Sequence, residues 1–393
     1  MNDKKSALAV ALLTTAILFP LFCLVLPVRA TSQTNGPAPL LSHPSPAPGS
    51  VFVHTALGGF ILGYDIDRTG TEGLLSEALT LPDGSHNVAV ETFDQKTGKT
   101  IKIIKQLSNS QNDFVTWGIF GKNVGLVEFE HTKNGFVDKR LYGTLDPVNA
   151  NKFTGRWTPP LKKDEIIAVV APSQGVANTA VFAFENGGSN QSVVFSSNVA
   201  ANTFGPRITL DDPIFDFNFS PVMAYDSATN QAILGSGNGC PNCSPVIGIV
   251  DLTTGEQTEF TGLGFGLING IAVDPVKGIA CTTTEIDFSV EFYDLATHTG
   301  IIVQLPGATS QAQRGQDVEF DPIHKVFLIG QEFSSTAPSG SSIQIFDEQG
   351  NFLESVNGLS LPASSALIAL HPSKRAGYVI VTPELTELQS FTY

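Results

Sequence analysis

The chain has 393 residues, a formal net charge of −15 and a hydrophobic fraction of 42%. A surface this acidic disfavours nucleic acid and anionic membranes as partners, because both repel a negatively charged protein. The length and the apolar content are sufficient for one large folded domain, and all-β folds of this size commonly form a single unit.

The first 30 residues have the features of a secretory signal. Lys4 and Lys5 precede a long apolar run from Ala7 to Val28, and Ala30 is a small residue of the kind that a signal peptidase requires. We therefore expect residues 1–30 to be a signal peptide and the protein to be secreted, periplasmic or on the cell surface. Because the run is longer than a usual signal core, an uncleaved N-terminal anchor is the alternative. Such an anchor would be the protein's contact with a membrane.

A linker and one domain are expected after this segment. Residues 31–50 are rich in Pro, Ser and Ala, which is typical of semi-rigid extended segments outside a fold. Residues 51–393 consist of short apolar runs separated by turns, and no stretch shows a convincing helical period. We interpret residues 51–393 as a single all-β domain and expect it to be a monomer.

The first half of this domain divides into units of strand-like runs. Three units extend from about Gly58 to Leu107, from Asp113 to about Trp157 and from Glu165 to about Asn198. The region from Asn202 to Ser220 leads into a fourth unit, which ends near Thr261.

The second half contains four copies of one short phrase. The third residues of the copies lie 48, 47 and 50 residues apart. A repeat of this length, made of strands and turns, indicates a β-propeller. The copies are Ala224-Tyr225-Asp226-Ser227, Ala272-Val273-Asp274-Pro275, Glu319-Phe320-Asp321-Pro322 and Ala369-Leu370-His371-Pro372.

The clearest copy predicts how one blade is built. Between Gly270 and Leu305, four strand-like runs are joined by turns rich in Asp, Thr and Gly. The turn before the last run recurs as Asp94–Gly98, Asp251–Gly255 and Asp347–Gly350. In such turns the Asp side chain accepts hydrogen bonds from the following N–H groups, and Gly adopts the positive φ that the hairpin needs.

The blade count depends on how the ring closes. The sixth unit covers about Asp317 to Val356, and the last, from Ala366 to Tyr393, has only three strand-like runs. Exposed blade edges favour aggregation, so the ring needs a fourth strand there. We predict that the N-terminal strand Val51–His54 pairs with the last blade. Seven blades is the preferred count, and six and eight stay open.

Three cysteines follow the signal segment. Cys240 and Cys243 are separated by two residues in a loop, and in a secreted protein we expect them to form a small disulfide. Cys281 lies in an apolar run and is expected to be a buried thiol. A bridge from Cys281 to one member of the pair stays open, because the sequence does not decide connectivity.

Candidate ligand-binding residues stand where the innermost strands begin. Propeller sites usually lie at the mouth of the central channel, and oxygen-bearing side chains there could hold a hard cation such as Ca²⁺. A turn before a strand also explains Asn269, and a capped strand start also explains Asp317. Aligning the copies gives the following candidates for the channel: Asn112, Asp113, Asn269, Gln316 and Asp317.

The second half resembles known propeller families. The phrase from Asn269 to Pro275 is similar to the inner strand of NHL-repeat and gluconolactonase-like propellers, and the Asp-x-x-Thr-Gly turns are similar to those of YVTN propellers. This resemblance covers roughly residues 213–393. The gluconolactonase-like group holds a divalent metal in the channel with a Glu, Asn residues and an Asp. The resemblance carries over only to Asn269 and, as a carboxylate, to Asp317, since Pro221 and Ala366 break the ring of ligands.

These observations favour a binding protein over an enzyme. The sequence contains no Gly-x-Ser-x-Gly, His-Glu-x-x-His or phosphate-binding glycine loop. We expect a secreted or envelope-associated scaffold that binds a protein or a small molecule and needs no cofactor. The alternative is a divalent-metal-dependent hydrolase of lactonase or esterase type with its site at the channel mouth, which would use Ca²⁺.

Overall fold

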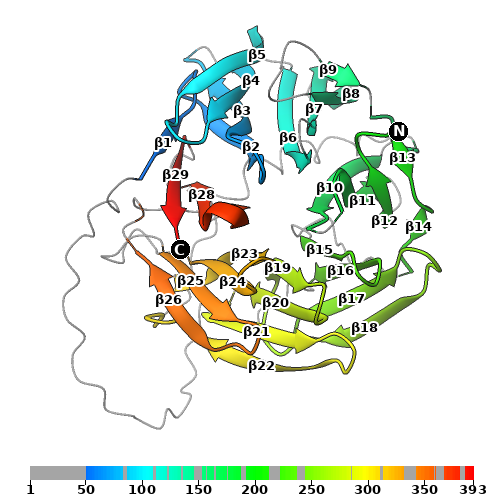
Figure 1. Cartoon of the computed structure of the whole chain (residues 1–393). Coiled ribbons are helices and arrows are strands. Elements are labelled where there is room, and N and C mark those ends of the chain that lie inside the picture. Colours follow the sequence, from blue (N-terminus) through cyan, green and yellow to red (C-terminus); the bar gives the residue numbers. More distant parts are fainter. Residues whose placement is uncertain are drawn as a thin grey trace, which may run out of the picture.

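The computed structural model shows the domain as a ring of seven antiparallel sheets around a central channel (Figure 1). This confirms the all-β propeller and the count of seven blades. The structure describes residues 50–393 except for 83–85, 109–111, 122–123, 134–135, 146–152, 156, 163–164, 175, 187–191, 212–221, 237–243, 285, 310–312, 332–341, 358, 360–366 and 381–385.

Each blade has its innermost strand at the channel and its outermost strand at the rim. Blade 1 consists of β2 (Phe60–Ile66), β3 (Glu72–Thr80), β4 (His86–Asp94) and β5 (Thr100–Ser108). Blade 2 consists of β6 (Asn112–Gly121), β7 (Val124–Lys133), β8 (Phe136–Leu145) and β9 (Phe153–Gly155). Blade 3 consists of β10 (Glu165–Pro172), β11 (Thr179–Asn186), β12 (Ser192–Asn198), β13 (Thr203–Phe204) and β14 (Ile208–Thr209).

The remaining blades repeat this order along the chain. Blade 4 consists of β15 (Val222–Asp226), β16 (Gln231–Ser236), β17 (Val246–Asp251) and β18 (Gln257–Thr261). Blade 5 consists of β19 (Ile268–Asp274), β20 (Ile279–Thr284), β21 (Ser289–Asp294) and β22 (Thr299–Gln304). Blade 6 consists of β23 (Gly315–Asp321), β24 (Val326–Gln331), β25 (Ser342–Asp347) and β26 (Phe352–Val356). Blade 7 consists of β27 (Ile368–His371), β28 (Ala376–Ile380), β29 (Glu387–Thr392) and β1 (Phe52–His54).

The first and last strands of the domain close the ring. β1 pairs antiparallel with β29, with Phe52 opposite Gln389 and His54 opposite Glu387. Figure 1 shows the two strands side by side, β1 in blue and β29 in red. The Val51 N–H donates to Ser390 Oγ over 2.8 Å, and the Ser390 N–H donates to the Val51 carbonyl over the same distance. The predicted closing strand is therefore confirmed.

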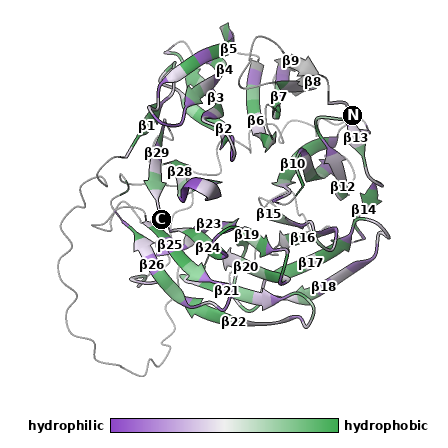
Figure 2. Ribbon diagram, in the orientation of Figure 1, coloured by the Kyte–Doolittle hydropathy of each residue, from purple (hydrophilic) through white to green (hydrophobic). Residues whose placement is uncertain are grey.

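The blades are held together by apolar side chains between neighbouring sheets. Alternate residues of a strand point to opposite faces, so each blade contributes to two interfaces. On β20, Ala280 packs toward blade 4 and Cys281 toward blade 6. One buried apolar cluster lies between each pair of neighbouring blades, including the pair that closes the ring. Figure 2 shows hydrophobic residues along the strands of the blades.

Aspartate side chains organise the turns as predicted. Asp251 Oδ1 accepts hydrogen bonds from the Thr253 and Thr254 N–H groups at 2.7 and 2.8 Å, and Gly255 has a φ of +79°. Blade 5 differs in one respect, because the residue with positive φ in its outer turn is His298.

Blade 3 extends further than the sequence indicated. The short strands β13 and β14 both pair with β12, and together they form the outer edge of the blade. Residues 203–209 therefore belong to blade 3 and do not lead into blade 4.

Candidate functional site

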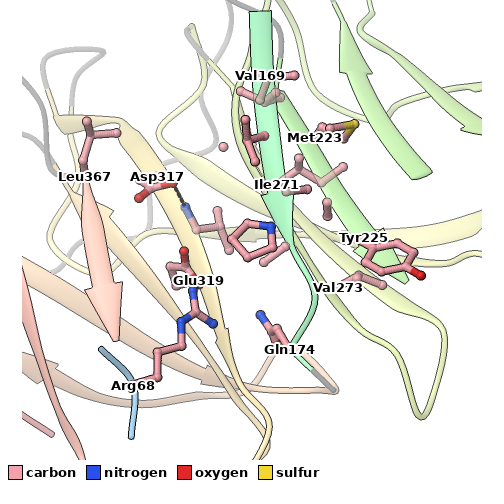
Figure 3. Close-up of a pocket in the computed structure, with 18 residues that line it drawn as sticks. Arg68, Val169, Gln174, Met223, Tyr225, Ile271, Val273, Asp317, Glu319 and Leu367 are labelled. Carbon is pink, nitrogen blue, oxygen red and sulfur yellow. Dashed lines mark hydrogen bonds and ion pairs between the residues drawn. The ribbon is translucent and has the colours of Figure 1, made fainter. Parts of the chain in front are cut away.

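A cavity of about 280 Å³ lies in the central channel (Figure 3). β10, β15, β19 and β23 form most of its wall, and Leu367 before β27 and the turn after β2 complete it. The side formed by β10, β15 and β19 is largely apolar and includes Val169, Met223, Tyr225, Ile271 and Val273. The charged side chains stand on β23 and on the turn after β2, and they are Arg68, Asp317 and Glu319.

Five innermost strands share one irregularity near the channel mouth, which is the end of the channel where these strands begin. One residue bulges out of the pairing with the second strand, which bends the strand and redirects the next side chain. The bulged residues are Leu62, Trp117, Ala168, Asn269 and Gln316. The residues that follow them are Gly63, Gly118, Val169, Gly270 and Asp317.

The structure brings three of the predicted site residues together, on blades 5 and 6. Asn269 and Gln316 are both bulged residues, and Asp317 follows directly. Asn269 Nδ2 donates to the Gly315 carbonyl over 3.2 Å, so this amide links the two blades. Gly270 is required for the close approach, because a Cβ there would lie 2.8 Å from Asp317 Cα. Asn269, which we predicted as a ligand-binding residue, therefore forms a hydrogen bond that holds the two blades together.

The other two predicted residues lie away from this position. Asn112 and Asp113 begin β6, whereas the bulge of that strand is at Trp117. The residues of blade 2 that correspond to Gln316 and Asp317 are therefore Trp117 and Gly118. Asp113 is half-buried, and burial raises its pKa while the nearby His86 acts in the opposite direction. The sequence alignment paired Gln316 and Asp317 with Asn112 and Asp113, and the structure moves this pairing five residues later in blade 2, to Trp117 and Gly118.

Asp317 joins blade 6 to blade 7 at the mouth of the cavity. Its Oδ2 accepts from the Ile368 N–H over 2.8 Å, and its Oδ1 accepts from the Val318 N–H over 2.9 Å. Burial raises the pKa of Asp317 to about 6, although both hydrogen bonds act to lower it. Asp317 is therefore a carboxyl group on the wall of the cavity, and it lies within β23 rather than at the start of that strand.

Glu319 is a second carboxyl group in the cavity, and the sequence analysis did not select it. It lies two residues after Asp317 on β23, and Arg68 Nη2 is 3.8 Å from its Oε2. Burial raises the pKa of Glu319 to about 8. Arg68 acts to lower this pKa, and the charge of Asp317 raises it further.

Asp65 and Tyr64 extend the polar region onto blade 1. Asp65 Oδ2 accepts from the Ile119 N–H over 2.7 Å, which links blade 1 to blade 2. Burial raises the pKa of Asp65, and its charge acts on Glu319. The Tyr64 hydroxyl lies 2.8 Å from the Leu367 carbonyl oxygen and thus ties blade 1 to blade 7.

A signal for Glu319 and Asp65 was present in the repeat. Glu319 occupies the first position of the recurring phrase, where the other three copies have Ala224, Ala272 and Ala369. A charged residue in place of alanine on an innermost strand marks a position that faces the channel. Asp65–Asp67 is the corresponding phrase of blade 1, since the Asp67 carboxylate accepts from the Thr69 N–H over 2.9 Å as the other turn aspartates do.

The cavity combines an apolar surface with a group of buried carboxyl groups, which a bound cation would favour in their ionised form. Arg68 interacts with Glu319 and Asp65, and Asp317 lines the same cavity, so carboxyl groups outnumber the nearby cation. Such a site is suited to a cationic or hydrogen-bond-donating group attached to an apolar body. Within the described ranges, no three His, Cys, Asp or Glu side chains converge closely enough to hold a metal ion.

Several other predictions concern residues outside this region. Cys281 is buried and its thiol is free, as expected. Cys240, Cys243, the signal segment and the linker up to residue 49 lie outside the described residues. In the part of the chain that the structure describes, no helix is long and apolar enough to cross a membrane.

Comparison with protein-family models gives no match. Comparison with curated protein sequences gives no significant match either. The resemblance to NHL-repeat, YVTN and gluconolactonase-like propellers therefore rests on the phrases quoted above.

Proposed function

We propose that this propeller is a binding scaffold whose central cavity accepts a small molecule with an apolar body and a cationic group. The observation that carries the proposal is the juxtaposition of Asp317 and Glu319 with the apolar wall of β10, β15 and β19. A pocket of mixed character, mostly apolar with a few convergent polar groups, is typical of small-molecule sites.

The charge of Glu319 provides the test. Candidate organic amines, compared with neutral molecules of the same shape, are titrated calorimetrically into the wild type and into Glu319→Gln. We expect the wild type to prefer the amine and Glu319→Gln to bind it about tenfold or more weakly, because a charge-assisted hydrogen bond is lost. Asp113→Asn, which alters a half-buried carboxyl group outside the cavity, is the matched control. Equal affinity of the wild type and Glu319→Gln would contradict the proposal.

A divalent-metal-dependent hydrolase of lactonase or esterase type is the second candidate. The raised pKa values of Asp317 and Glu319 favour it, since a carboxyl group that titrates near neutral pH can act as a general acid or base. Metal analysis of the purified protein separates the two candidates. One Ca²⁺ or Zn²⁺ per chain that is lost in Asn269→Ala, together with lactone hydrolysis, would favour the hydrolase.

The proposed setting is secreted, periplasmic or on the cell surface, with the domain a monomer. The apolar N-terminal run and the Pro-rich linker support this location. N-terminal sequencing of the mature protein checks whether residues 1–30 are removed, and size-exclusion chromatography checks the oligomeric state.

A further inference from the structure

Three blades carry a polar side chain at the same buried position. Glu91, Glu291 and Gln344 each lie three residues before the aspartate of the outer turn, on the third strand of blades 1, 5 and 6. Their exposed fractions are 0%, 0% and 3%. A polar group at this depth needs hydrogen-bond partners, because a buried polar atom without one destabilises the fold.

In blades 1 and 6, the polar side chain at this position has hydrogen-bond partners. Glu91 accepts from the Thr100 hydroxyl over 3.0 Å and from the Ala56 N–H over 3.1 Å, so each of its oxygens has a donor. Gln344 donates to Gln331 Oε1 over 2.7 Å and accepts from the Ser355 hydroxyl over 2.5 Å. The groups that bond to these residues thus come from the same blade or from the segment that leads into it.

Blade 5 leaves one oxygen of Glu291 without a partner. Glu291 Oε2 accepts from the Thr282 hydroxyl over 2.5 Å, whereas Oε1 is buried and has no hydrogen-bond partner. The Thr284 hydroxyl, also on the second strand of this blade, is likewise buried without a partner.

A second carboxylate converges on the same place. A Cβ at Gly264 would lie 2.2 Å from Glu291 Oε1 and 3.1 Å from Asp287 Oδ2. Gly264 belongs to the segment 262–267, which connects β18 to β19 and covers this end of blade 5. Asp287 Oδ2 also accepts from the Phe265 N–H over 2.7 Å. Neither carboxylate forms an ion pair with any residue that the structure describes.

Burial disfavours the negative charge of both carboxylates, and a positive charge between them would offset this. Burial raises the pKa of Glu291 to about 8, and the charge of Asp287 raises it further. The pKa of Asp287 is also raised by burial. A hard cation would compensate both carboxylates, and it prefers oxygen ligands such as carboxylates, with water filling the remaining positions.

We propose that a calcium ion binds between Glu291 and Asp287 beneath the segment 262–267, with water completing its coordination. The ion supplies the partner that Ala56 supplies to Glu91 in blade 1. It ties the connecting segment to blade 5 and so stabilises the junction of blades 4 and 5. This site is separate from the channel and does not depend on the proposed function.

The protein is first freed of metal with EDTA. Calcium is then added, and its effect on the melting temperature and the heat of its binding are measured. We expect CaCl₂ to raise the melting temperature of the wild type saturably by about 3 °C or more, with one ion bound per chain in calorimetry. Glu291→Gln should lose this response, and Asp287→Asn should bind calcium at least tenfold more weakly. Glu91→Gln is the matched control and should respond as the wild type does.

Three outcomes would overturn the proposal. The first is a wild type that neither binds calcium in calorimetry nor gains stability from it. The second is a Glu291→Gln protein that responds as the wild type does, which would place the ion elsewhere on the acidic surface. The third is loss of the response in Asn269→Ala but not in Glu291→Gln, which would assign the ion to the channel.

Discussion

At the scale of single residues, the recurring aspartate is a turn residue rather than a functional group. Asp274 Oδ1 accepts from the Val276 N–H, and Asp321 Oδ1 accepts from the Ile323 N–H, at 2.9 and 2.7 Å. In blade 7 the equivalent residue is His371, whose Nδ1 lies 3.2 Å from the Ser373 hydroxyl. The phrase therefore recurs because each innermost strand ends in the same turn.

Among the recurring aspartates, Asp321 makes additional hydrogen bonds, so we expect its substitution to destabilise the fold most. Its Oδ2 also lies 2.7 Å from His324 Nδ1 and accepts from the Tyr393 hydroxyl over 2.6 Å. We predict that Asp321→Ala lowers the free energy of unfolding by about 2–4 kcal/mol, because the buried carboxylate accepts from several partly buried donors that would lose this acceptor. Asp251→Ala, which removes an exposed turn cap with two similar N–H contacts, should cost much less in the same urea titration. Equal losses would show that Oδ2 contributes nothing.

The candidate site could be predicted in part, and the reason lies in the repeat. Asn269 and Asp317 could be identified from the sequence, because the repeats in the second half of the chain are regular enough to align. Glu319 was present in the quoted phrase, but its meaning required knowing that its position faces the channel. Arg68 could not be predicted, since only the closed ring brings a side chain of blade 1 close to Glu319 of blade 6.

At the scale of elements, the innermost strands explain why the first half was harder to align. β6 is irregular twice, between Thr116 and Gly118 and between Ile119 and Gly121, whereas β23 is irregular once. Each additional bulge shifts the positions of later residues by one. The outer strand of blade 3 is divided into β13 and β14, which also makes the first half hard to align. Each piece has two residues, too few to show the alternating pattern of a strand.

β1 is the element on which closure depends. Val53 is fully buried in the cluster between blades 7 and 1, and β1 covers the edge of β29. We predict that a chain beginning at Ala56 is destabilised and associates through the exposed edge of β29. A chain beginning at Ser50 retains β1 and is the control. Urea titration and size-exclusion chromatography measure both effects, and a stable monomer beginning at Ala56 would show that β1 is dispensable.

At the scale of the whole molecule, buried carboxyl groups link stability to pH. Burial raises the pKa of Glu91 from 4.5 to about 7 and those of Glu291 and Glu319 to about 8. Between these values and 4.5, the folded protein holds protons that the unfolded chain has released. Stability must therefore fall as pH rises through this interval, by about 1.4 kcal/mol for each unit by which one pKa is raised.

We accordingly predict that the metal-free protein is most stable near pH 5 and that its melting temperature falls steadily toward pH 8. Carboxyl groups with lowered pKa, such as Glu165 beside Arg207, act in the opposite direction, but their effect is confined to pH values below about 4.5. Glu91→Gln should flatten the fall between pH 5 and pH 7, because an amide does not titrate and keeps the same shape. Glu259→Gln, which alters an exposed side chain, should leave the profile unchanged. Differential scanning calorimetry in EDTA at constant ionic strength measures these profiles. A maximum of stability at pH 7 or above would contradict the prediction. It would mean that these carboxyl groups are ionised in the folded protein and are compensated by cations or water.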